Sequence, residues 1–134
     1  MPRIVIIEDD EMLSGMLKEL LLCAGYLVAS AANGFEGMAA VRAERTDLVI
    51  TDMFMPHGGL ATLRVLRAEF PALPVIAMSG APARLQMATD LGACRILEKP
   101  FNVGRLLRTV AETLTAYDHG PGGSSGLGML DLAV

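Results

Sequence analysis

The alternation of short apolar runs with amphipathic segments constrains the fold of this chain more than any other feature. Continuous apolar stretches predict strands at residues 4–7, 27–31, 48–50, 75–78 and 95–98. Apolar residues at helical spacing predict helices at residues 12–21, 35–42, 60–70, 85–91 and 103–114. Such alternation requires a parallel sheet with right-handed crossovers and helices on both faces. The sequence therefore predicts an α/β, doubly wound (βα)5 fold with a five-stranded parallel sheet.

The third apolar run, at residues 48–50, leads directly to the carboxylate of Asp52. A run without polar interruption is typical of a parallel strand that is buried on both faces. Open α/β sheets bind their ligands at the carboxyl ends of such strands. Asp52 is therefore a candidate functional residue, although an acid that merely terminates a strand explains this position equally well.

The length of the chain and its composition limit the classes of protein to consider. With 134 residues, the chain is expected to form one domain at residues 1–117, followed by a flexible Gly/Ser-rich tail at residues 118–134. No apolar run approaches the roughly 20 residues that a membrane-spanning helix needs, so no membrane contact is expected. The first residues lack the layout of a signal peptide, and a cytoplasmic location is the expectation.

The net charge argues against nucleic acid as a direct partner. The formal net charge is −4 and the 11 Lys and Arg residues form no cluster. Binding to nucleic acid phosphates requires a basic patch or stripe on the protein. We therefore expect no direct contact with nucleic acid.

Chemically reactive side chains follow four of the five predicted strands. In a doubly wound sheet the carboxyl ends of all strands lie at one edge, so these side chains are expected to converge. Helix capping accounts for Asp10 and Glu11 but not for the two acids that precede them. The converging residues are Glu8, Asp9, Asp52, Ser79 and Lys99.

Three converging carboxylates need a cation, or else a proton on one of them. Two carboxylates about 4 Å apart repel each other by roughly 4 kcal/mol at the effective dielectric of a protein surface. Lys99 supplies a single positive charge. An oxygen-loving divalent ion fits best, which predicts Mg²⁺, with Mn²⁺ as a substitute. Its expected ligands are Asp9 and Asp52 directly, Glu8 through water, and a backbone carbonyl from the loop after Asp52.

An ionised carboxylate beside Mg²⁺, a hydroxyl and an amine is suited to phosphoryl transfer. Asp52 is the expected nucleophile, because aspartyl phosphates are an established covalent form. Ser79, Lys99 and the metal would each bind one phosphoryl oxygen as charge develops. No general base is required for a carboxylate nucleophile.

At about residues 3–117 the chain resembles the response-regulator receiver domains of two-component signalling. The resemblance rests on four motifs in a specific order and spacing, at residues 6–10, 52–56, 78–80 and 98–101. It implies a flavodoxin-like sheet with strand order 2-1-3-4-5 and a cis bond before Pro100. It also implies the backbone carbonyl of Phe54 as a metal ligand, and phosphorylation of Asp52 by a histidine kinase or histidine phosphotransfer protein.

The chain departs from the family pattern at three places. Ile96 stands where members usually carry an aromatic switch residue, and an aliphatic side chain cannot make the swing of that switch. The loop at residues 56–60 is one residue shorter than the common form. Phe54 and Ala81 replace polar groups that orient water for dephosphorylation in many members. We therefore hypothesise a slowly hydrolysing aspartyl phosphate, which a lifetime of seconds with Mg²⁺ present would rule out.

Two classes of function remain open. The first is a phosphoacceptor module with slow autophosphatase activity rather than a turnover enzyme. The second is a degenerate receiver that only binds partners, which Ile96 mildly favours. A Mg²⁺-dependent phosphatase is a more distant alternative, because it would need a second acid where Phe54 stands. A downstream protein is expected at the face formed by residues 85–91, 95–98 and 103–114, on a monomer or weak dimer.

Overall fold

The computed structural model describes residues 1–55 and 59–117. Its sheet contains β1 (Arg3–Ile7), β2 (Leu27–Ala31), β3 (Leu48–Asp52), β4 (Val75–Ser79) and β5 (Arg95–Glu98). All paired strands are parallel, and their order is β2-β1-β3-β4-β5. The predicted α/β class and the flavodoxin-like order 2-1-3-4-5 are both confirmed.

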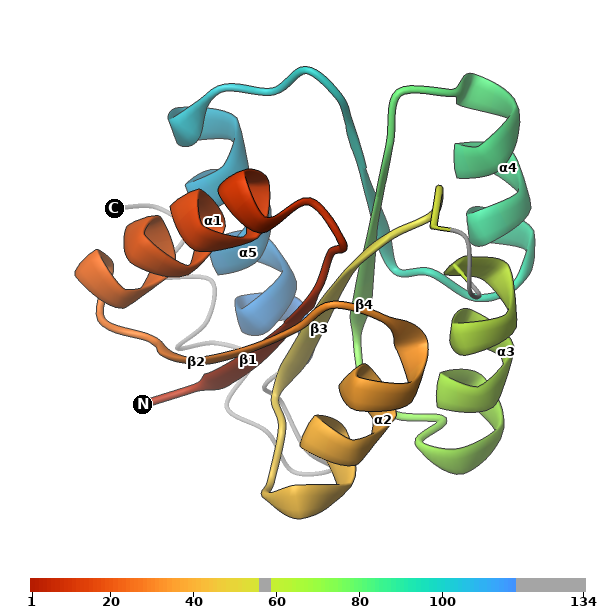
Figure 1. Cartoon of the computed structure of the whole chain (residues 1–134), viewed down its shortest axis with the longest axis horizontal. Coiled ribbons are helices and arrows are strands. Elements are labelled where there is room, and N and C mark those ends of the chain that lie inside the picture. Colours follow the sequence, from red (N-terminus) through yellow and green to blue (C-terminus); the bar gives the residue numbers. More distant parts are fainter. Residues whose placement is uncertain (56–58, 118–134) are drawn as a thin grey trace.

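Helices cover both faces of this sheet (Figure 1). They are α1 (Glu11–Cys23), α2 (Gly34–Ala43), α3 (Gly59–Glu69), α4 (Pro82–Asp90) and α5 (Val103–Tyr117). Buried side chains of α1 and α5 pack on one face, whereas those of α2, α3 and α4 pack on the other. Every residue of β3 and β4 is buried, as the uninterrupted apolar runs predict. The edge strand β5 buries only Leu97.

The helix boundaries follow local signals in the sequence. Asp10 caps α1, because its side chain accepts hydrogen bonds from the backbone N–H groups of Met12 and Leu13. Gly25 and Gly92 follow α1 and α4 with φ angles of 98° and 100°, a conformation that costs glycine little. The capping role predicted for Asp10 is therefore confirmed.

Two predictions fall on residues outside the described part of the chain. The shortened loop at residues 56–60 includes residues 56–58, and the Gly/Ser-rich tail spans residues 118–134. The boundary between a domain at 1–117 and this tail stays a prediction. Among the described residues, no helix is both long and apolar enough to cross a membrane.

Candidate functional site

The carboxyl edge of the sheet brings the predicted acids together. Glu8 directly follows β1, and Asp52 ends the neighbouring strand β3. Glu8, Asp9 and Asp52 each offer a carboxylate oxygen, and these oxygens lie within 4.8 Å of one another. Glu8 and Asp52 are only 2% and 4% exposed, whereas Asp9 faces solvent. Two of the three negative charges therefore stand in a largely desolvated position.

Lys99, which follows β5, bridges the two buried acids. Its Nζ lies 3.1 Å from Glu8 Oε1 and 3.3 Å from Asp52 Oδ2. The peptide bond from Lys99 to Pro100 is cis, as the family resemblance implies. The predicted convergence of Lys99 on the acids is thus observed.

Backbone N–H groups hold the remaining polar atoms of the site. Glu8 Oε2 accepts from the N–H of Asp10 at 3.1 Å, and Asp52 Oδ1 accepts from the N–H of Phe54 at 3.0 Å. Ser79 ends β4 almost fully buried, and its Oγ accepts from the N–H of Ala81 at 3.0 Å. Each of these acceptors is therefore fixed in direction before any ligand arrives.

Burial and the neighbouring charges of the site shift two pKa values. Burial raises the pKa of Glu8 from 4.5 to about 7, and the negative charge of Asp52 adds to this effect. The N–H of Asp10 and the Lys99 ammonium oppose the shift without cancelling it. Burial lowers the pKa of Lys99, but its hydrogen bond to Glu8 and the charge of Asp52 outweigh burial and raise it overall. Lys99 is thus held in its charged form.

The donor set fits a hard divalent cation. The converging ligand atoms are all carboxylate oxygens, and one ammonium group balances only part of their charge. Burial keeps the pKa of Glu8 raised although Lys99 binds its carboxylate, so a second cation beside it would favour the ionised form. Glu8, Asp9 and Asp52 are the described residues whose side chains are placed to hold a metal.

Arg84 is a residue of this region that sequence reasoning missed. From α4, its Nη1 donates to the backbone carbonyl of Met53 at 3.3 Å. Its guanidinium carbon lies 5.0 Å from the centre of the Phe54 ring, a cation–π distance. A half-buried arginine on an amphipathic helix gives no sequence signal, because its partners become neighbours only through the fold.

Replacing Gly59 with alanine is expected to destabilise the fold by about 1–3 kcal/mol, the usual cost of overpacking. A Cβ at Gly59 would lie 2.7 Å from the Met53 carbonyl atoms, which are backbone and cannot turn aside. The midpoint of urea unfolding measures the loss. Gly15→Ala is the matched control, because its Cβ meets no atom within 4 Å and alanine favours the helix. Equal stability of the two variants would contradict this reasoning.

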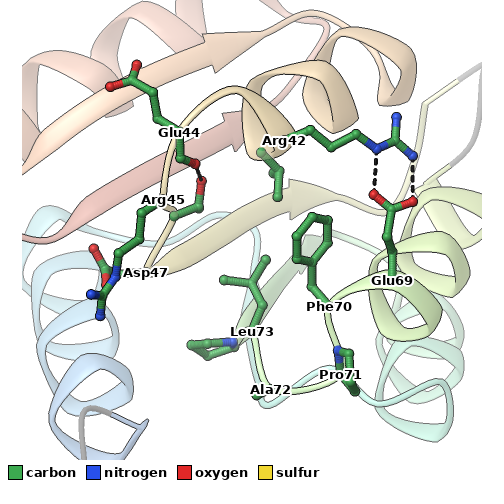
Figure 2. Close-up of a pocket in the computed structure, with 12 residues that line it drawn as sticks. Arg42, Glu44, Arg45, Asp47, Glu69, Phe70, Pro71, Ala72 and Leu73 are labelled. Atoms are coloured by element: carbon green, nitrogen blue, oxygen red, sulfur yellow. Dashed lines mark hydrogen bonds and ion pairs between the residues drawn. The ribbon is translucent and has the colours of Figure 1, made fainter.

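A separate cavity of about 600 Å³ has no residue of the acidic cluster in its lining. Figure 2 shows the residues that line this cavity. It lies between the segment that follows α2 and the segment that follows α3, and Phe70 and Leu73 line it. Arg42 Nε and Nη2 bind the carboxylate of Glu69 at 2.5 and 2.7 Å. None of the residues predicted for the functional site lines this cavity.

Comparison with protein families identifies the class of this domain. The family model of the response regulator receiver domain matches residues 4–111 of this chain. The chain belongs to this family. Receiver domains of response regulators act in two-component signalling, where histidine kinases phosphorylate them, and they generally bind Mg²⁺ at an acidic pocket.

Relatives of this receiver domain are response regulators of greater length. Response regulator MprA of Mycolicibacterium vanbaalenii is 31% identical over 137 aligned positions, which cover 98% of this chain and 59% of the relative. The DNA-binding dual master transcriptional regulator RpaA of Synechocystis is 34% identical, over 90% of this chain and 52% of the relative. The chain thus spans just over half the length of these two relatives.

Solved structures of receiver domains share the fold over most of the chain. The chemotaxis response regulator CheY4 of Vibrio cholerae is 29% identical, with a TM-score of 0.79 over 84% of this chain and 98% of the other. A CheY-like receiver domain protein from Methanospirillum hungatei is 27% identical, with a TM-score of 0.83 over 88% and 97%. These matches agree with the observed strand order.

Proposed function

We propose that this receiver domain accepts a phosphoryl group on Asp52 in a two-component phosphorelay. The observation that carries the proposal is the immobilised Asp52 carboxylate, which the N–H of Phe54 and the ammonium of Lys99 hold from two sides. The donor is a phosphohistidine of a histidine kinase or of a histidine phosphotransfer protein. Phosphorylation then changes the contacts of the domain with other proteins.

The residues of the chain supply most of the transfer chemistry. An Asp52 oxygen forms a bond to phosphorus while the bond from phosphorus to the donor imidazole nitrogen breaks, and the imidazole then takes a proton from solvent. Lys99 Nζ binds a phosphoryl oxygen as charge develops on it. Ser79 Oγ accepts the N–H of Ala81, so its own hydroxyl hydrogen is available to a second phosphoryl oxygen.

The metal ligands in this proposal are Glu8, Asp9, Asp52 and the backbone carbonyl of Phe54. Mg²⁺, or Mn²⁺ in its place, would neutralise negative charge on the transferred phosphoryl group. Glu8 and Asp52 also bind Lys99, which keeps both carboxylates directed into the same space.

The output partner in this proposal is a protein. Its docking face is formed by α4, β5 and α5, which expose Met87, Ile96 and Val103 at 47%, 43% and 46%. Ile96 is aliphatic and cannot act as an aromatic switch, which favours the alternative of a phosphorylation-independent binding module. The assembled acids and Lys99 favour the phosphoacceptor, because a pure binding module has no need to bury them together.

Wild-type protein incubated with Mg²⁺ and acetyl phosphate is expected to gain the mass of one phosphate. Asp52→Ala is expected to gain none, because the nucleophile is gone, whereas the control Asp90→Asn on the exposed side of α4 should match wild type. Intact-protein mass spectrometry measures the gain. Following the label after donor removal gives its lifetime, and a decay within seconds would contradict slow hydrolysis. If wild type gains no mass, the binding-module function replaces this proposal.

A further inference from the structure

We propose that Arg84 is a positioning residue that sets the direction of the metal-binding loop after Asp52. This inference rests on the proposed function, because it concerns the Phe54 carbonyl that is assigned there as a metal ligand. Arg84 projects from the first turns of α4 and belongs to neither the acidic cluster nor the strand ends. Its influence on the site therefore has to pass through the groups that it contacts.

Arg84 and Asp52 hold opposite sides of one peptide group. The carbonyl of Met53 accepts from Arg84 Nη1 at 3.3 Å, and the N–H of the same peptide, which belongs to Phe54, donates to Asp52 Oδ1 at 3.0 Å. A peptide group is planar, so two bonds at its opposite ends fix its rotation. The positive charge of Arg84 also polarises this peptide and strengthens the N–H bond to the carboxylate.

The contact with the Phe54 ring extends this control by one residue. The guanidinium carbon of Arg84 lies 5.0 Å from the ring centre, although the Phe54 side chain is 64% exposed. Without a partner, such an exposed ring would sample several rotamers. With the preceding peptide and the ring both held, rotation of the Phe54 backbone is restricted, which narrows the directions that its carbonyl can take.

The first turn of α4 also reaches the other side of the site. The N–H of Arg84 bonds to the carbonyl of Ala81, whose own N–H bonds to Ser79 Oγ. One helical turn therefore connects the hydroxyl at the end of β4 with the loop after β3. These contacts join α4 to the strand ends of β3 and β4 without any residue of β5.

Binding of Mg²⁺ to the unphosphorylated protein tests this role directly. Calorimetric titration of the full chain with MgCl₂ is expected to show about three- to tenfold weaker binding for Arg84→Ala than for wild type, the size of one lost hydrogen bond. Arg84→Lys keeps a cation over the ring and one donor, and should restore most of the affinity. Arg64→Ala removes an exposed arginine from α3 and should bind as wild type does.

A spectroscopic readout separates positioning from a general loss of structure. The amide resonance of Phe54 should shift in Arg84→Ala without Mg²⁺, return toward its wild-type place in Arg84→Lys, and stay unchanged in Arg64→Ala. Arg84→Met keeps the aliphatic part of the side chain and replaces Arg84→Ala in both measurements if the alanine variant is unstable.

The outcomes distinguish this inference from the proposed function. If wild type binds Mg²⁺ and gains phosphate but the Arg84 variants have wild-type affinity, Arg84 has no positioning role and the proposed function stands. If wild type binds no Mg²⁺, the metal site and the role of Arg84 are both overturned. If only the affinity falls, with the Phe54 resonance unmoved, the effect does not pass through the loop and the inference is wrong.

Discussion

Replacing Lys99 with methionine is expected to slow phosphorylation of Asp52 about 100- to 1,000-fold, the usual cost of removing one preorganised donor to a developing charge. Methionine keeps much of the lysine chain length but has no ammonium group for the phosphoryl oxygens. The rate of mass gain with acetyl phosphate and saturating Mg²⁺ measures the effect. Lys18, on α1, is the only other lysine of the chain, so Lys18→Met is the matched control.

The same substitution should also lower stability, by an amount that depends on metal. Without Lys99, the buried carboxylates of Glu8 and Asp52 lose their cation, which typically costs about 3–5 kcal/mol when one member of a buried pair is removed. Mg²⁺ should then stabilise Lys99→Met more than wild type, because a metal replaces the missing positive charge. Urea unfolding with and without MgCl₂ measures both effects. If Lys99→Met is phosphorylated at the wild-type rate, Lys99 has no role in phosphoryl transfer.

The strand ends of this site could be predicted because their signals are local. Uninterrupted apolar runs mark β3 and β4, and parallel strands bring the residues at their carboxyl ends to one edge of the sheet. Asp52 and Ser79 therefore fall where the sequence predicts. The same holds for Asp10, because a cap acts within its own turn of helix.

The remaining features could not be predicted because they depend on packing between distant segments. Arg84 meets Met53 across 31 positions of sequence, and no pattern in α4 distinguishes it from a solvent-exposed arginine. Adjacent acids also differ in a way that the sequence does not show. Glu8 is buried against Lys99 whereas Asp9 faces solvent, although both carboxylates lie within reach of Asp52. The burial of Glu8 raises its pKa, which makes this acid a source of pH-dependent stability.

The metal-free protein is expected to lose stability as the pH rises from about 5 to 8, through the ionisation of Glu8. The folded chain holds the Glu8 proton up to a pKa of about 7, whereas the unfolded chain releases it near 4.5. The contribution of Glu8 to the free energy of unfolding is therefore fully present below about pH 4.5, and it is lost as the pH rises through about 7. A shift in pKa from 4.5 to about 7 corresponds to about 3 kcal/mol at about 1.4 kcal/mol per pKa unit.

Glu8→Gln isolates this effect because glutamine resembles the neutral acid at every pH. At pH 5 the variant and wild type should be about equally stable in EDTA, and at pH 8 the variant should be more stable by up to about 3 kcal/mol. Glu19→Gln, on the exposed face of α1, should follow wild type at both pH values. Mg²⁺ competes with the proton for the same oxygens, so adding it should stabilise wild type at pH 8 far more than at pH 5. Parallel pH profiles for wild type and Glu8→Gln would show that the site tolerates the ionised acid without a metal, and the electrostatic reason for a divalent cation would be lost.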